Sequence, residues 1–338
     1  MKYTFILLLP LAIYLINSFL RKNLLLLNFT GEKHQKFVIR EKVPLSGGFV
    51  LLISYFFIFF NYDVNLSIYL IIIFCLGLFS DLNFISSPKI RFLFQLIILC
   101  TFVYFFKLEI NNTRIIILDN MMDNNFFSYF FVVFCVLILV NGTNFIDGLN
   151  TNVLGYYLIL SIFILNQDFY NLLEIDKFQW ITWIYCLAVL YIFNLFKRLF
   201  IGDGGAYLIG LFYSFLVIKI FTVNPSISPF YIVLLLWYPC FEILFSILRK
   251  INFNRSPLYP DNKHLHQILY VLIKKYFKIK NIDPNSLSAN IINSYNLITI
   301  SLGSLDIYNS QYQIMLILFN IIFYVFVYLR ILNKIYKI

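Results

Sequence analysis

The sequence predicts an all-α integral membrane protein, a polytopic bundle of about eleven transmembrane helices, and three observations support this prediction. Of the 338 residues, 61% are hydrophobic and 12% are charged, and the mean hydropathy is +0.83. The apolar residues form long runs, many of them close to the roughly 20 residues that cross hydrocarbon. The basic residues gather between alternate runs, as in polytopic membrane proteins. This composition excludes a soluble globular domain.

The first apolar run, residues 3–20, has the length of a signal peptide. Arg21 and Lys22 follow it, only Lys2 precedes it, and no small-residue cleavage site is evident, so we expect a retained first span. The other runs predict spans at 45–61, 67–80, 91–107, 126–143, 152–166, 179–196, 205–222, 229–248, 288–303 and 312–331. The run 288–303 is the weakest, because three asparagines interrupt it.

The distribution of Lys and Arg predicts the orientation. With the N-terminus outside, the odd-numbered connections and the C-terminal tail hold 21 of the 26 basic residues, which places them in the cytoplasm. We expect one transmembrane domain over 1–338, with a cytoplasmic loop at 249–287. Within that loop, 265–280 has an apolar stripe with lysines mainly off it, which predicts an amphipathic interfacial helix. A short helix packed on the bundle is the alternative.

Four polar clusters fall on the predicted cytoplasmic face, where they would line a cleft. Their sequences are SDLNFISSPKIR (80–91), NGTNFIDGLN (141–150), NLFKRLFIGDGG (194–205) and NRSPLYPDNKHLHQ (254–267). One carboxylate at a helix end usually caps that helix. Three of them, Asp81, Asp147 and Asp203, at three junctions rich in Gly or Asn, indicate a functional site.

The second cluster has a spacing of three. If its helix continues, Asn141, Asn144, Asp147 and Asn150 lie on one stripe that faces the cleft. An oxygen-rich ligand set of this kind suits Mg²⁺, or Mn²⁺, rather than zinc. The five cysteines lie in apolar runs without metal-type spacing, so we expect them to pack as small apolar residues.

With these motifs in this order, the chain resembles the polyprenyl-phosphate N-acetylhexosamine-1-phosphate transferases of glycosyltransferase family 4, relatives of the phospho-N-acetylmuramoyl-pentapeptide transferase. The resemblance runs from PLSGG (44–48) to HLHQ (264–267). It implies transfer of a sugar-1-phosphate from a UDP-N-acetylhexosamine to undecaprenyl phosphate, with release of UMP and a requirement for Mg²⁺. It also implies a multi-pass protein of the bacterial inner membrane that starts a cell-surface glycan such as the O-antigen of lipopolysaccharide. Membrane lipid is an expected partner, nucleic acid is not, and a homodimer is left open.

The resemblance also implies roles for individual residues. Asp203 and Asp147 would hold the metal and, with Asp81, form the catalytic carboxylates. Asn141, Asn144 and Gly148 match the second motif. Leu149 and Asn150 fall where the family contacts the uracil edge, and Phe200 matches a phenylalanine that stacks on uracil. The residues that would bind phosphate groups are Arg255, Lys263, His264 and His266.

Several positions depart from the family pattern, and Ser80 is the most important of them. It stands where the family has the first Asp of a pair, which is often proposed to deprotonate the lipid phosphate. Because the second pKa of a phosphate monoester is ~6, the acceptor is mostly a dianion at neutral pH, and a base is then dispensable. The other departures are Leu45, Asn150, Gln267 and Glu242.

Two alternatives remain open. Ser80 is compatible with a weak or inactive homologue that binds UDP-sugar or lipid phosphate without turnover. A secondary transporter fits less well, because the sequence shows no internal repeat and its carboxylates gather at one membrane face.

Overall fold

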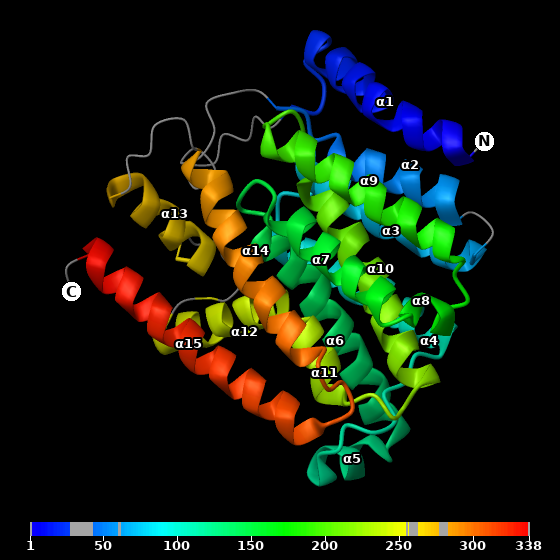
Figure 1. Ribbon diagram of the computed structural model, residues 1–338, viewed down its shortest axis with the longest axis vertical. Coiled ribbons are helices and arrows are strands. Elements are labelled where there is room, and N and C mark those ends of the chain that lie inside the picture. The colour runs from blue at the N-terminus through cyan, green and yellow to red at the C-terminus, as the bar shows by residue number, and fades with distance from the viewer. Residues whose placement is uncertain are drawn as a thin grey trace.

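The computed structural model describes the backbone of residues 2–27, 43–59, 62–254, 256, 263–276 and 283–336, and the side chains from Leu8 to Ile335 within these ranges. The described residues form helices with no regular sheet (Figure 1). The helices are α1 (Lys2–Lys22), α2 (Gly47–Phe59), α3 (Val64–Asp81), α4 (Pro88–Phe106), α5 (Ile116–Met122), α6 (Asn125–Ile146), α7 (Asn152–Asn166), α8 (Phe169–Leu172), α9 (Lys177–Leu195), α10 (Gly202–Val223), α11 (Pro229–Leu235), α12 (Trp237–Asn252), α13 (Leu265–Tyr276), α14 (Pro284–Gly303) and α15 (Ser310–Tyr336).

Each predicted span corresponds to helical structure, with α11 and α12 sharing the run 229–248. Among the described residues, six helices are long and apolar enough to cross a membrane, and the bent pair of α11 and α12 would make a seventh. The α2 and α7 helices are apolar but shorter. The fold class of a polytopic helical membrane protein is therefore confirmed, and the number eleven stays a prediction.

Helix α10 lies in the centre of the bundle and packs against α2, α3 and α6. Most of its residues are buried inside the protein. A helix that is apolar on every side is stable only when other elements surround it. Rings from α2, α9 and α10, including Phe59, Trp183 and Phe212, meet edge-on or tilted beside it. This central position fixes the first residues of α10, where the GDGG sequence begins.

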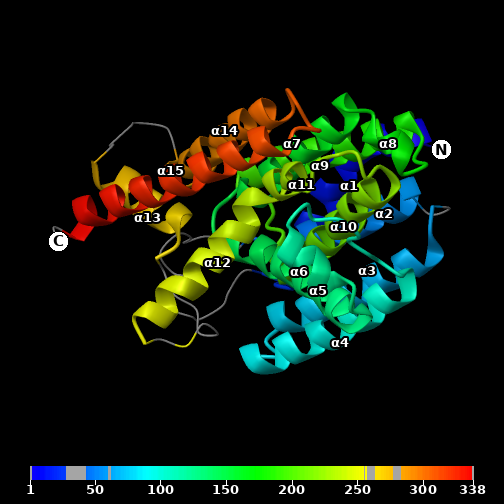
Figure 2. The same ribbon diagram turned by 90° about the horizontal axis from the view of Figure 1, so that it is seen from below.

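The ninth predicted span is broken rather than straight. Helices α11 and α12 meet at Leu236 with a bend of 81°, and Figure 2 shows α12 running obliquely away from α11. Pro239 has no N–H to donate to Leu235, four residues earlier, which favours a break at this point. The Tyr156 hydroxyl donates to the Leu235 carbonyl instead, at 2.5 Å. The bend directs α12, which carries Glu242, toward His264, the residue before the first residue of α13.

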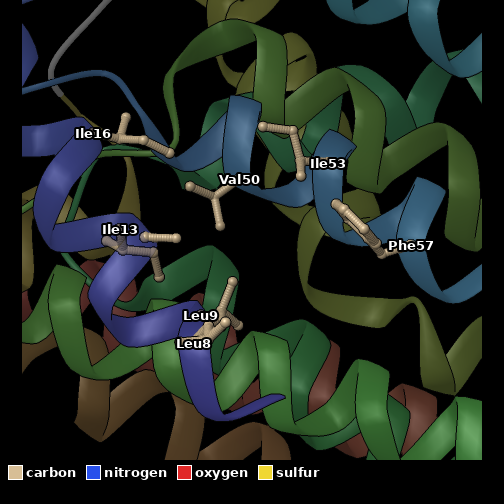
Figure 3. Close-up of a pocket in the computed structure, with 8 residues that line it drawn as sticks. Leu8, Leu9, Ile13, Ile16, Val50, Ile53 and Phe57 are labelled. Atoms are coloured by element: carbon tan, nitrogen blue, oxygen red, sulfur yellow. The ribbon is translucent and has the colours of Figure 1, made fainter. Parts of the chain in front are cut away.

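A small cavity of about 200 Å³ lies between α1 and α2 (Figure 3). Its lining consists of Leu8, Leu9, Ala12, Ile13, Ile16, Val50, Ile53 and Phe57. No polar side chain reaches it from the described residues, so it offers no group for binding or chemistry.

Candidate active site

The carboxylate of Asp81 holds the first turn of α10. Its Oδ1 accepts the Asp203 N–H at 3.0 Å, and its Oδ2 accepts the Gly204 N–H at 3.2 Å. Gly202 has φ +71°, and a Cβ there would lie 2.6 Å from Asp81 Oδ2, so only glycine fits. The positive end of the α10 dipole also favours an anion at this position. Because both oxygens already accept hydrogen bonds, this geometry supports an organising role for Asp81 over a role as base.

Asp203 lies beside Ser80 and Arg91. The Ser80 hydroxyl donates to Asp203 Oδ2 at 2.7 Å, and Arg91 Nη1 donates to the same oxygen at 2.9 Å. Arg91 Nη1 also lies 2.5 Å from Ser80 Oγ. The Arg91 and Asp203 side chains are each 26% exposed, so the pair is reachable from outside. Ser80 therefore contacts two charged groups at the position where the resemblance predicts the first Asp of a pair.

Asp147 follows the last residue of α6 and is partly buried. Its carboxylate accepts no hydrogen bond from the described residues, whereas Asp81 and Asp203 accept several. Burial raises the pKa of Asp147, and the negative charges of Asp203 and Asp81 raise it further. The three predicted carboxylates therefore act on one another, and the end of the bundle that they form is called the site end below.

These carboxylates are compatible with Mg²⁺. No three His, Cys, Asp or Glu side chains among the described residues form a complete metal cluster. Mg²⁺ commonly needs only one or two carboxylates, because water and substrate phosphates supply its other ligands. A cation beside Asp147 would offset both its missing hydrogen bonds and the repulsion between the carboxylates. The donor set at the site end is thus compatible with a divalent cation.

The asparagines of residues 141–150 do not form one continuous stripe. Helix α6 ends at Ile146, so Asn150 lies in the following turn. Asn141 donates to the Leu137 carbonyl of its own helix at 3.0 Å. Asn144 donates to the Tyr207 hydroxyl at 3.3 Å, which ties α6 to α10. Within the described part of the chain, only Asn144 of the three asparagines bonds to another helix through its side chain.

The turn that contains Asn150 is held by asparagines of α14. The Asn150 N–H donates to Asn285 Oδ1 at 2.7 Å, and Asn293 donates to the Thr151 carbonyl at 3.0 Å. Asn150 is 4% exposed, and its own amide nitrogen has no partner among the described residues. The asparagines that interrupt the tenth apolar run therefore face the protein rather than lipid. Their contacts position the residues expected to meet uracil.

Glu242 and two histidines form the second part of the site. Glu242 is 1% exposed, and its Oε1 lies 3.0 Å from His264 Nδ1 and accepts the Leu265 N–H at 3.1 Å. Its Oε2 accepts the Tyr324 hydroxyl of α15 at 2.7 Å. The rings of His264 and His266 stack at 5.5 Å and 12°, because His264 precedes the first residue of α13. The two rings therefore face the same way, which side chains two positions apart on one continuous helix would not do.

His266 connects this part to the second motif. A Cβ on Gly148 would lie 2.4 Å from His266 Nε2, so the glycine makes room for the ring. His266 is 0% exposed, and neither ring nitrogen has a partner among the described residues. Burial lowers the pKa of His266 to about 3, although the charge of Glu242 opposes that shift. His266 is therefore neutral near pH 7.

Two of the remaining predicted residues are buried. Phe200 is 9% exposed, and Leu149 is 4% exposed in a small cluster with Tyr270 and Ala289. The Lys263 carbonyl accepts the Tyr328 hydroxyl at 3.0 Å. Arg255 lies outside the described residues. Sequence reasoning did not assign Arg91, Glu242 or Tyr324 to the site, although the sequence segment SSPKIR contains Arg91 only 11 residues after Ser80.

Comparison with known proteins shows what the chain is similar to. Residues 64–221, from α3 to α10, match the model of glycosyl transferase family 4. An undecaprenyl-phosphate alpha-N-acetylglucosaminyl 1-phosphate transferase of Thermotoga maritima is 26% identical over 251 residues, which are 74% of this chain and 76% of that protein. The proteins of the same name from Salmonella typhi and Escherichia coli K12 are each 28% identical, over 67% of this chain and 65% of their own length. Over residues 64–221, the chain is therefore similar to glycosyl transferase family 4.

Proposed function

We propose that this protein transfers N-acetylhexosamine-1-phosphate from a UDP-sugar to undecaprenyl phosphate. The observation that carries the proposal is the meeting of Asp81, Asp147 and Asp203 at the site end, with Arg91 beside them. The names of the relatives support the acceptor, and they favour N-acetylglucosamine as the sugar. Carboxylates, a guanidinium and backbone N–H groups at one helix start suit a substrate that carries a diphosphate.

The reaction is a single displacement at phosphorus. An oxygen of the lipid phosphate attacks the β-phosphorus of the UDP-sugar and forms the new diphosphate bond. The bond from that phosphorus to the bridging oxygen breaks, and UMP leaves with the bridging oxygen and its electrons. The acceptor needs no proton removed when it is a dianion, which accommodates Ser80 at its position. Charge neutralisation and alignment then supply most of the catalysis.

The role proposed for each residue follows from its position in the site. Asp203 and Asp147 would hold Mg²⁺ or Mn²⁺, which supplies charge neutralisation on the diphosphate. Asp81 fixes the start of α10, so that Asp203 stays in place. Arg91 reaches the same oxygen of Asp203 and offers a guanidinium to a phosphate. His264, His266 and the basic residues near them would bind the phosphate of the acceptor.

The distribution of Lys and Arg supports a site on the cytoplasmic side of the inner membrane. The lipid-linked product would then begin a surface glycan such as an O-antigen.

Release of UMP by the purified protein in detergent tests the proposal. The mixture contains undecaprenyl phosphate, Mg²⁺ and one of several UDP-N-acetylhexosamines. We expect UMP only when lipid and donor are both present, with loss of the signal in EDTA and recovery with added Mg²⁺. Asp203→Asn should lower the rate by roughly a hundredfold or more. A folded wild-type protein that releases no UMP with any donor would instead indicate an inactive homologue.

A further inference from the structure

Tyr207 lies one turn after Asp203 on α10 and is 2% exposed. Its hydroxyl accepts a hydrogen bond from Asn144 Nδ2 of α6 at 3.3 Å. Gln95 of α4, which is 1% exposed, interacts with the same hydroxyl. One buried hydroxyl thus brings together three helices that surround the carboxylates.

This contact lies one helical turn deeper in the bundle than the ion pair of the site. Both α4 and α10 begin at the site end, where Arg91 donates to Asp203. Gln95 and Tyr207 each follow these two residues by four positions, which is about 6 Å along each helix. Helix α6 runs in the opposite direction and ends at the site end, so Asn144 in its last turn reaches Tyr207 from the site.

The contact with Tyr207 determines which side of the Asn144 amide is available. Because Nδ2 is directed to the buried hydroxyl, Oδ1 on the other side of the amide faces away from Tyr207. Asn144 is half-buried, and its Oδ1 accepts no hydrogen bond from the described residues. An amide oxygen accepts hydrogen bonds, whereas an amide nitrogen donates them. A partner of Oδ1 must therefore carry an N–H or an O–H.

A tyrosine is well suited to hold the amide in this orientation. Its hydroxyl has acceptor lone pairs as well as one proton, so it can accept from Asn144 and still donate to another group. The burial of Tyr207 and Gln95 keeps away water that would compete for the amide nitrogen. A phenylalanine would fill the same space without the oxygen, and the amide would then be free to rotate.

We propose that Tyr207 is a positioning residue that directs Asn144 Oδ1 toward the sugar-nucleotide donor. The inference rests on the proposed function, because that function supplies a UDP-sugar whose ribose, sugar and base carry O–H and N–H groups. The diphosphate of that donor offers acceptor oxygens only, so it is not the partner of Oδ1. Tyr207 acts through Asn144 and touches no reacting atom.

Tyr207→Phe removes the hydroxyl and keeps the ring. Tyr213→Phe is the matched control, because Tyr213 is a buried tyrosine farther along α10 whose hydroxyl accepts from Trp183 Nε1 at 3.0 Å. UMP release is measured against the concentration of UDP-N-acetylglucosamine, at saturating Mg²⁺ and undecaprenyl phosphate. The Tm of each purified variant shows whether it is folded.

We expect Tyr207→Phe to raise KM for the UDP-sugar by about threefold to tenfold with little change in kcat, because the lost hydrogen bond orients a group that binds the donor. Tyr213→Phe should lower Tm and leave this KM at the wild-type value. KM for undecaprenyl phosphate should stay the same in both variants. A wild-type donor KM in Tyr207→Phe would overturn the proposal.

A double variant tests whether Tyr207 acts through Asn144. Asn144→Ala should raise the donor KM by itself, and Tyr207→Phe should raise it no further in that background. If the two effects multiply instead, the residues act independently and the positioning role is wrong.

Calorimetric titration with UDP-N-acetylglucosamine and Mg²⁺, without acceptor, separates this inference from the proposed function. Tyr207→Phe should raise Kd by about the same factor as KM, and Tyr213→Phe should not. If this pattern occurs in protein that releases no UMP, the positioning role holds and the proposed transfer fails. If the wild-type protein releases UMP but binds the donor no more tightly than Tyr207→Phe, the transfer holds and the positioning role fails. A wild-type protein that binds no UDP-N-acetylglucosamine would overturn both.

Discussion

Glu242 Oε1 lies 3.0 Å from Nδ1 of His264, and the other oxygen of the same carboxylate accepts the hydroxyl of Tyr324. The carboxylate is almost fully buried, so these contacts replace the water that would otherwise solvate it. They connect α12, the start of α13 and α15, three elements that are separate in the sequence. The carboxylate thereby determines which way the His264 ring faces. In the sequence, Glu242 stood out only as a departure from the Asp that the family resemblance predicts.

Glu242→Gln should reduce kcat/KM by about tenfold to a hundredfold, because a hydrogen bond to a charged group contributes about 1.5–3 kcal/mol. Glu242→Asp should restore part of the loss, since it keeps the charge on a shorter arm. Tyr324→Phe removes one neutral donor and should cost less. Steady-state UMP release with each variant is the measurement. Wild-type kinetics for folded Glu242→Gln would show that the carboxylate does not position His264 for the reaction.

Arg91→Gln should lower the Mg²⁺ concentration for half-maximal activity and lower kcat. The guanidinium now shares Asp203 Oδ2, and its removal frees that oxygen for a cation. Because the ion pair is about a quarter exposed, it contributes at most about 1 kcal/mol, so the Mg²⁺ requirement should change by up to about fivefold. Titration of activity with Mg²⁺ gives the midpoint, with Lys89→Gln as the control on the same helix. A higher midpoint in Arg91→Gln would contradict this expectation.

The common location of the three carboxylates could be predicted from the sequence, because successive spans place every second connection on the same side of the membrane. Asp81, Asp147 and Asp203 each follow or begin an apolar run, and counting runs assigns them to one end. No side-chain geometry is needed for that step. The relation of Arg91 to Asp203 has no such rule, since the two residues are 112 positions apart and the contact depends on how α3, α4 and α10 pack.

The apolar pattern alone does not explain the structure of two helices. The run 229–248 appears continuous, yet Pro239 lacks the N–H for the hydrogen bond that would continue the helix from α11 into α12. The run 288–303 appears weak because hydropathy treats Asn290 and Asn293 as if they faced lipid. Asn293 instead bonds to Thr151, so its polarity serves an internal contact. The sequence pattern shows where polar residues lie, but it does not show which neighbouring group forms a hydrogen bond with each of them.

His266 should make the protein sensitive to acid. Its pKa is about 3 in the folded protein, because burial disfavours the charged ring, and about 6.5 in an unfolded chain. Below pH 6.5 the unfolded state therefore binds more protons, and stability falls as the pH decreases toward 3. At pH 5 the loss amounts to about 2 kcal/mol relative to pH 7.

Unfolding in detergent between pH 7 and pH 5 measures this loss for the wild type and for His266→Asn. The variant has no group that titrates at this position, so its stability should fall less over that interval. His266 also lies in the proposed phosphate-binding region, and the comparison therefore uses stability rather than turnover. Parallel pH profiles for the two proteins would show that the buried ring does not contribute.

Arg114 should stabilise the end of the bundle opposite the site. Its guanidinium donates to the carbonyls of Ser226 and Tyr308 at 2.7 and 3.0 Å and to Ser310 Oγ at 2.9 Å, joining three loops. Arg114→Met removes these donors, so Tm should fall by about 2–6 °C while UMP release at low temperature stays unchanged. Lys107→Met in the same loop is the control, because no hydrogen bond joins its ammonium group to the described residues. An equal Tm for the two variants would mean that Arg114 does not hold the loops together, and a selective loss of turnover would mean that this end of the bundle influences the site.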